Sequence, residues 1–116
     1  MTVSFNRVDN VYVDIYVLRM TPEGKVKAAV AKILKKYNVY YFFPATGGYG
    51  RSGVPDIVGC LNGRFIGIEC KAGNNKPTAL QGRELKRICE AGGSSTVVDE
   101  TNIVRFESWI KFMETK

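Results

Sequence analysis

Apolar residues recur at helical spacing near the start of the chain. The apolar positions of this stretch are Val26, Ala29, Val30, Ile33, Leu34 and Tyr37. Positions three and four residues apart lie on one face of an α-helix. Thr21 can cap such a helix, Pro22 fits its first turn, and the acid Glu23 suits the positive end of the helix dipole. The pattern predicts an amphipathic helix over residues 22–37.

Shorter apolar runs bounded by glycine or proline follow this helix. Strands are expected over residues 39–43, 55–61, 65–71 and 95–98, and helices over residues 78–91 and 103–113. Asn62-Gly63 is typical of a tight turn between two antiparallel strands, and Gly92-Gly93 is a natural end for a helix. The predicted order is helix, three strands, helix, strand, helix, which is an α/β (α+β) fold class with no internal repeat.

The first 19 residues differ from the rest of the chain. Their apolar residues Val11, Val13, Ile15 and Val17 alternate with Tyr12, Asp14, Tyr16 and Leu18. Alternation of this kind indicates a strand, which would be an added edge strand or an oligomer contact. We therefore divide the chain into an N-terminal extension, residues 1–19, and a single domain, residues 20–116.

The composition narrows the chemistry that the chain can perform. The 116 residues include no histidine and have a formal net charge of +6. The absence of histidine excludes a Ser-His-Asp triad, a Cys-His pair, a Cys2His2 zinc finger and an HExxH metalloprotease. Any catalysis must use carboxylates, lysine, hydroxyl groups or a metal ion. The positive charge favours nucleic acid as a partner, although a soluble basic protein without such a partner has the same excess.

The cysteines and the lengths of the apolar runs indicate where in the cell the protein is expected. Cys60, Cys70 and Cys89 form no CxxC pair, and three cysteines cannot all pair within one chain. We expect them to be reduced and mostly buried in a cytoplasmic protein. No stretch reaches the roughly 18–20 apolar residues of a membrane span. Asp9 and Asp14 interrupt any basic-then-apolar signal pattern, so we expect no membrane partner.

Two carboxylates and a lysine are expected to meet at one end of the predicted hairpin. Glu69 and Lys71 are alternate residues of a strand, so their side chains share a face and that of Cys70 points the other way. Counting outward from the turn at Asn62-Gly63 places Asp56 opposite Glu69. The three charged groups therefore converge at the end of the hairpin that lies away from its turn.

Two carboxylates held close together repel each other, and a divalent cation between them removes that repulsion. Oxygen ligands without histidine favour Mg²⁺ or Mn²⁺ over zinc. Such an ion can activate a water molecule and neutralise charge at a phosphorus atom under attack. Lys71 can orient the water or stabilise the developing charge. The same residues also fit a surface hairpin with a Glu–Lys pair and an unrelated turn aspartate.

Two further polar residues lie on the inward faces of predicted helices. Glu23 is three residues before Val26, on the apolar side of the first helix. A metal site would supply the partner that an inward acid needs, and the alternative is a first-turn acid favoured by the helix dipole. Gln81 is four residues before Leu85. It can serve the same site or close a capping box with Thr78.

Together these motifs resemble the virus-type replication-repair nuclease (VRR-NUC) family of the PD-(D/E)XK nuclease superfamily. They are Gly53-Val54-Pro55-Asp56, Ile68-Glu69-Cys70-Lys71 and Pro77-Thr78 through Gln81, with an acidic residue early in the first helix. They lie within about residues 21–98. The resemblance implies a restriction-endonuclease-like αβββαβ core, in which helices flank a mixed four-stranded sheet. This chain would add an N-terminal strand and a C-terminal helix.

The resemblance also implies an activity and residue roles. The activity is Mg²⁺- or Mn²⁺-dependent hydrolysis of DNA phosphodiester bonds. The implied catalytic residues are Asp56, Glu69, Lys71 and Gln81. The implied metal ligands are Glu23, Asp56, Glu69 and the backbone carbonyl of Cys70. Small members are similar to Holliday-junction resolvases, which act as homodimers on branched DNA. Many are phage-encoded, which would place the protein in the host cytoplasm.

Contacts with DNA phosphates are expected from two basic residues. Arg51 lies in a glycine-rich loop five residues before Asp56, and Lys76 leads the helix over residues 78–91. Tyr49 in the same loop can stack on a base or simply pack, and the loop itself can be a turn without DNA contacts. Three alternatives remain, namely a restriction-type or flap endonuclease of the same superfamily, a non-catalytic nucleic-acid-binding module, and a small structural or interaction protein.

Overall fold

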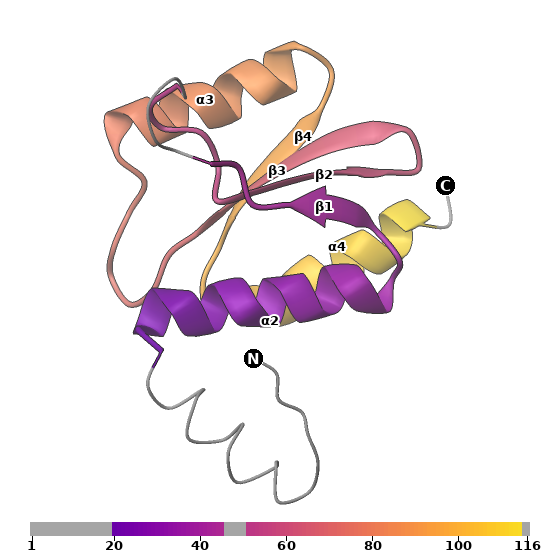
Figure 1. The fold of residues 1–116 in the computed structure, drawn as a ribbon, viewed down its shortest axis with the longest axis horizontal. Coiled ribbons are helices and arrows are strands. Elements are labelled where there is room, and N and C mark those ends of the chain that lie inside the picture. The colour runs from indigo at the N-terminus through magenta and orange to yellow at the C-terminus, as the bar shows by residue number, and fades with distance from the viewer. Residues whose placement is uncertain (1–19, 46–50, 115–116) are drawn as a thin grey trace, which may run out of the picture.

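The computed structural model describes residues 20–45 and 51–114 (Figure 1). The strand expected within residues 1–19 and the side chain of Tyr49 lie outside the described residues. The elements in chain order are α2 (Pro22–Lys36), β1 (Tyr40–Phe42), β2 (Ile57–Leu61), β3 (Arg64–Cys70), α3 (Ala79–Glu90), β4 (Ser94–Val98) and α4 (Ile103–Glu114). The order predicted from the hydrophobic pattern is confirmed, with strand ends that differ from the prediction by one or two residues.

The four strands form one mixed sheet in the order β1-β2-β3-β4. β1 with β2 and β2 with β3 are antiparallel pairs, whereas β3 and β4 are parallel. A parallel pair needs a crossover connection, and α3 supplies it. α3 covers one face of the sheet, and α2 and α4 lie on the other (Figure 1). The predicted α/β class with a mixed four-stranded sheet flanked by helices is thus confirmed.

The turn between β2 and β3 sets the register of the central hairpin. Asn62 has φ 53° and Gly63 has φ 82°, and both values lie in the left-handed region that a type I′ turn requires. Ile57 consequently pairs with Ile68 across the two strands. The pairing expected from counting outward from this turn is confirmed.

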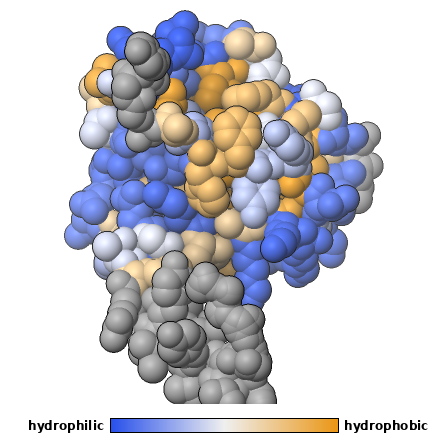
Figure 2. Space-filling model, viewed as in Figure 1, coloured by the Kyte–Doolittle hydropathy of each residue, from blue (hydrophilic) through white to orange (hydrophobic). Residues whose placement is uncertain are grey.

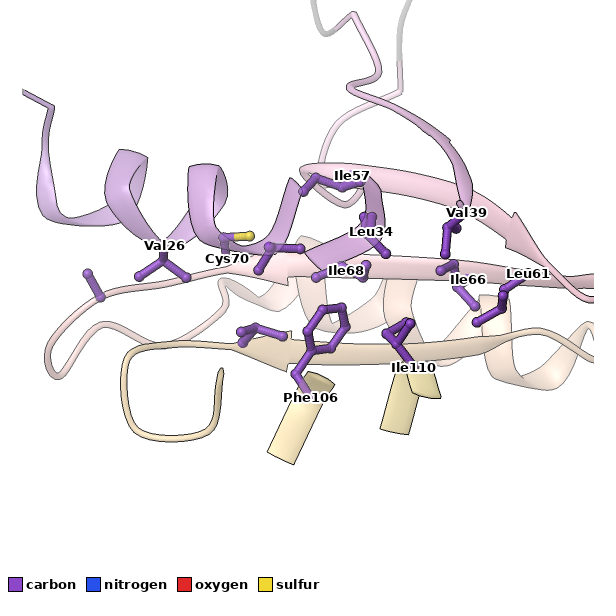
Figure 3. Packing of buried hydrophobic residues seen from close by; sticks show 13 residues of the cluster. Val26, Leu34, Val39, Ile57, Leu61, Ile66, Ile68, Cys70, Phe106 and Ile110 are labelled. Atoms are coloured by element: carbon purple, nitrogen blue, oxygen red, sulfur yellow. The ribbon is translucent and has the colours of Figure 1, made fainter. Parts of the chain in front are cut away.

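The hydrophobic core lies between the sheet and the pair α2 and α4 (Figure 3). Its buried members from the helices are Val26, Val30, Leu34, Phe106 and Ile110. Its buried members from the strands include Ile57, Leu61, Ile66, Ile68 and Val98. The Thr21 hydroxyl accepts a hydrogen bond from the Gly24 amide at 3.0 Å, so the predicted cap begins α2. None of the helices among the described residues is long and apolar enough to cross a membrane.

All three cysteines are free thiols, but only Cys70 is buried. The expectation that they are mostly buried is therefore wrong for Cys60 and Cys89. Cys60 lies between the buried residues Gly59 and Leu61 on β2, so strand alternation turns its side chain away from the core.

Gly59 provides a test of the packing between the edge strand and its neighbour. A Cβ added at Gly59 would lie 2.4 Å from the Tyr40 carbonyl oxygen, whereas one added at Gly82 in α3 would meet nothing within 4 Å. We expect Gly59→Ala to lower the free energy of unfolding by about 1–3 kcal/mol through overpacking. Gly82→Ala, the matched control, should raise it by about 0.5–1 kcal/mol because alanine favours helix. Urea unfolding curves with equal midpoints for both variants would contradict this account.

Candidate active site

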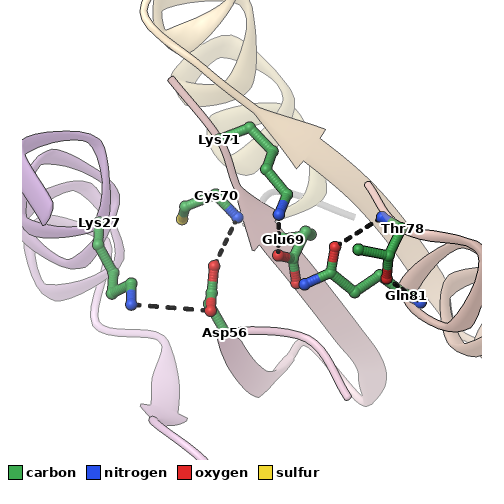
Figure 4. Close-up of polar contacts among 7 residues, drawn as sticks. All are labelled: Lys27, Asp56, Glu69, Cys70, Lys71, Thr78 and Gln81. Atoms are coloured by element: carbon green, nitrogen blue, oxygen red, sulfur yellow. Dashed lines mark hydrogen bonds and ion pairs between the residues drawn. The ribbon is translucent and has the colours of Figure 1, made fainter. Parts of the chain in front are cut away.

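Asp56 links the start of β2 to the end of β3. Its Oδ2 atom accepts a hydrogen bond of 2.9 Å from the backbone N–H of Cys70 (Figure 4). Its Oδ1 atom lies 3.7 Å from the Nζ atom of Lys27, on α2. Because Ile57 pairs with Ile68, Asp56 stands across the hairpin from Glu69. The structure therefore places this carboxylate where three elements meet.

Glu69 is a buried acid, with 1% of its surface exposed. Neither of its carboxylate oxygens has a hydrogen-bond partner of good geometry among the described residues. The nearest cation is the Nζ atom of Lys71, 3.4 Å from Oε2. A buried carboxylate that lacks hydrogen bonds is expensive to keep ionised. It is therefore a group that would gain from an additional cation.

The pKa of Glu69 reflects this environment. Burial raises it to about 7, and the negative charge of Asp56 acts in the same direction, while Lys71 opposes both. Burial likewise raises the pKa of the Cys70 thiol to about 12, so that thiol is neutral at physiological pH. Its side chain is buried among the core residues, on the opposite face of β3 from Glu69. Only the backbone of Cys70 can therefore serve the site.

Glu23 takes a separate place in the first turn of α2. It lines an open hollow together with Lys27, Gly73 and Glu100. Among residues 20–45 and 51–114, no three acidic, cysteine or histidine side chains are close enough to hold a metal ion as a group. The structure thus brings Asp56, Glu69 and Lys71 together, and Glu23 does not join the two carboxylates in the observed geometry.

Gln81 closes the capping box at the start of α3. Its Oε1 atom accepts a hydrogen bond of 2.9 Å from the Thr78 amide, and the Thr78 hydroxyl accepts one of 3.2 Å from the Gln81 amide. The capping role, one of the two interpretations of this residue, is confirmed. In Figure 4 the Gln81 side chain extends from α3 toward Glu69. Capping occupies the side-chain oxygen and still leaves the amide nitrogen directed to the site.

Arg51 is held by an acid on α3. Its Nε atom lies 3.3 Å from Oε1 of Glu84, and an Nη atom of Arg87 lies 3.8 Å from Oε2 of the same carboxylate. Glu84 is buried, with 3% of its surface exposed. Lys76, the other expected phosphate contact, is exposed in the segment that precedes α3. Arg51 therefore lies beside the middle of α3, and Lys76 lies ahead of its first turn.

Lys27 and Glu84 are candidate functional residues that sequence reasoning missed. Glu84 lies three residues after Gln81 and four before Ile88, so the helical spacing that marked Gln81 as inward also marks Glu84. Lys27 lies four residues after Glu23 on α2. No sequence signal pairs it with Asp56, because that contact depends on how α2 packs against the hairpin.

Comparison with known proteins supplies a relative from a phage. No family model matches the chain. A protein of Acyrthosiphon pisum secondary endosymbiont phage 1, named "Putative nuclease p44", is 35% identical over 88 residues. The matched region covers 74% of this chain and 91% of the relative. The chain belongs to the family of this p44 protein. Membership of the VRR-NUC family is a finer assignment and stays a prediction.

The buried acid Glu69 gives a pH-dependent test. The pKa of Glu69 is raised from 4.5 to about 7, so the folded protein holds this proton more tightly than the unfolded chain. Its stabilising contribution is complete below about pH 4.5 and is lost as the pH rises through 7. In EDTA at pH 8, we expect Glu69→Gln to raise the free energy of unfolding by about 1–3 kcal/mol.

Urea unfolding of the wild type and Glu69→Gln between pH 4 and 8 measures this difference. Glu90→Gln is the matched control, because Glu90 is an exposed glutamate of α3. Its stability should follow that of the wild type across the range. Parallel pH profiles for the wild type and Glu69→Gln would show that Glu69 does not carry a raised pKa.

Proposed function

We propose that the chain is a metal-dependent endonuclease that hydrolyses DNA phosphodiester bonds at Asp56, Glu69 and Lys71. The observation that carries the proposal is the buried Glu69 carboxylate, which has no hydrogen-bond partner among the described residues and lies beside a second carboxylate and a lysine. The name of the phage relative gives independent support for the reaction class. A purely structural Glu–Lys pair would not need to bury both of its charges.

The oxygen donors at this site fit a hard divalent cation such as Mg²⁺ or Mn²⁺. The buried oxygens of Glu69 lack hydrogen bonds, and Oδ1 of Asp56 is met only loosely, by Lys27 at 3.7 Å. Asp56, Glu69 and the Cys70 carbonyl would hold the ion. Glu23, which stands apart from both carboxylates in the observed geometry, would act through water, or directly after a movement of the first turn of α2. When bound, such an ion supplies Lewis-acid stabilisation and a more acidic water molecule.

The side chains of the chain itself supply the remaining catalytic functions. Lys71 orients the attacking water or stabilises charge that develops on the phosphate. Its Nζ atom is fixed beside Glu69, and its side chain is only 11% exposed. Gln81 holds Lys71 or a phosphate oxygen through the amide nitrogen that capping leaves available. Lys27, next to Asp56, is suited to a second contact with the scissile phosphate.

Cleavage of a labelled DNA oligonucleotide tests the reaction class. We expect Mg²⁺-dependent cleavage that EDTA abolishes. Asp56→Ala should reduce the rate by roughly 10³-fold and Lys71→Ala by roughly 10²–10³-fold, because each removes stabilisation of the transition state. The matched control is Lys32→Ala, which removes an exposed lysine of α2 and should cleave at the wild-type rate. If folded Asp56→Ala cleaves as fast as the wild type, the proposed site is wrong.

We infer further that the substrate is branched DNA and that the chain acts as a homodimer. A protomer contains one set of Asp56, Glu69 and Lys71, and paired cuts in a four-way junction need two sets. The resemblance to small resolvase-like nucleases points the same way. A restriction-type or flap endonuclease of the same superfamily is the competing outcome. The substrate that is cut fastest distinguishes resolvase-like, restriction-type and flap activity.

A panel of linear, nicked, flapped and four-way substrates tests this finer proposal, with light scattering to measure the mass in solution. We expect the four-way junction to be cut faster than linear duplex, by a protein with the mass of a dimer. Equal rates on linear duplex and on the junction would remove the branched-DNA assignment and leave the nuclease assignment intact. A monomer that makes paired cuts would contradict the dimer.

A further inference from the structure

The sheet face that carries the two catalytic carboxylates also carries three exposed aromatic residues. Tyr40 is 70% exposed, Phe42 49% and Phe65 48%. Strand pairing joins Tyr40 to Cys60 and Cys60 to Phe65, so Tyr40 and Phe65 lie in one row across β1, β2 and β3. Phe65 precedes Glu69 by four residues on β3, which places both on the same face. The exposed aromatic residues and the proposed active site therefore lie on the same sheet face, on either side of the point where Ile88 of α3 and Pro55 cover Gly67.

A hollow beside one of these rings, Phe65, brings cations next to an aromatic side chain. Phe65 lines a hollow of about 250 Å³ together with Arg51, Arg87 and the buried Glu84. The Glu84 carboxylate lies within 4 Å of both guanidinium groups, although its Oε2 atom has no hydrogen-bond partner among the described residues. Two positive charges thus face one negative charge, and one buried acid positions both arginines. The excess positive charge suits an anionic group in the hollow.

We propose that this surface, formed by Tyr40, Phe42, Phe65, Arg51 and Arg87, binds unpaired nucleotides of the substrate strand. The bases stack on the three aromatic rings, and the two arginines hold the phosphates. Exposed aromatic side chains beside a basic groove are the arrangement by which proteins bind single strands. The rings require bases that are free of a duplex. The inference rests on the proposed nuclease function and adds the substrate class.

The charges on this surface favour nucleic acid over a second copy of the chain. Figure 2 shows hydrophobic side chains gathered over β1, next to hydrophilic surface from the neighbouring helices. Arg51 and Arg87 lie beside Phe65, and Glu84 neutralises only one of their two charges. A second copy of the same face would bring like charges together, whereas a nucleic-acid strand brings phosphates. A dimer interface on this face is an alternative outcome of the test below.

Binding of a fluorescent single-stranded oligonucleotide to the full chain, in EDTA to prevent cleavage, tests the inference. We expect Phe65→Ala and Tyr40→Ala to bind it about 5- to 150-fold more weakly, the range for losing one stacked base. Phe65→Leu should lose affinity similarly, because leucine restores apolar bulk without a ring. Val104→Ala is the matched control, since Val104 is an exposed apolar residue of α4, on the other side of the sheet.

The salt dependence separates stacking from charge. The slope of log affinity against log salt should be unchanged in Phe65→Ala. In Arg51→Gln and in Arg87→Gln the slope should become shallower by about 0.7, because each variant neutralises one phosphate fewer. Circular dichroism confirms that each variant is folded. The inference would be overturned if Phe65→Ala, Phe65→Leu and Tyr40→Ala all bound the single strand with wild-type affinity. It would also be overturned if the wild type did not bind the single strand.

The two proposals can fail separately. A wild-type dimer that becomes monomeric in Phe65→Ala and Tyr40→Ala would identify the face as a protein interface and overturn the inference. Absence of Mg²⁺-dependent cleavage, with single-strand binding that still depends on Phe65, would remove the nuclease function and support the binding surface. Normal cleavage together with ring-independent binding would overturn the surface alone.

Discussion

A buried carboxylate beside a second carboxylate is the constraint on which the candidate site depends. Glu69 has lost its contact with water, and Asp56 adds repulsion, so the isolated arrangement is unfavourable. The apolar side of the same hairpin offsets this cost, because Ile57 and Ile68 pair across the strands and are fully buried beneath the site. A slip of one residue in this register would exchange the two faces and send Glu69 into the core. The Asn62-Gly63 turn, with both residues at positive φ, sets the register.

The close approach of α3 completes the site on the sheet face that carries the two carboxylates. A Cβ added at Gly67 would lie 2.5 Å from Cδ1 of Ile88 and 3.1 Å from Cγ of Pro55, so α3 and Pro55 both pack closely on β3 at this glycine. The helix thereby brings Gln81 and Glu84 to the sheet face that carries the two carboxylates. The alternation of side chains along β3 thus separates the hydrophobic core from the candidate site.

The sequence was informative where a feature depends on neighbours along the chain. Helical spacing and glycine boundaries located the elements, and counting from one turn placed Asp56 opposite Glu69. The sequence was weaker where a feature depends on packing between distant segments. The approach of Lys27 to Asp56 needs the orientation of α2 on the sheet, which no local pattern in the sequence gives. For Gln81, spacing alone left two roles open, and the observed capping bonds established one of them without excluding the other.

The fold contains two buried glutamates, each flanked by cations, and the balance of charge differs between them. Glu69 has a second carboxylate beside it, and burial together with that negative charge raises its pKa more than the nearby Lys71 lowers it. Glu84 instead faces two guanidinium groups, which leaves positive charge in excess. By Coulomb's law the first cluster gains from an additional cation and the second from an anion. The proposed metal-dependent reaction on a phosphodiester strand would bring one of each, with the cation at Glu69 and a phosphate at Arg51 and Arg87.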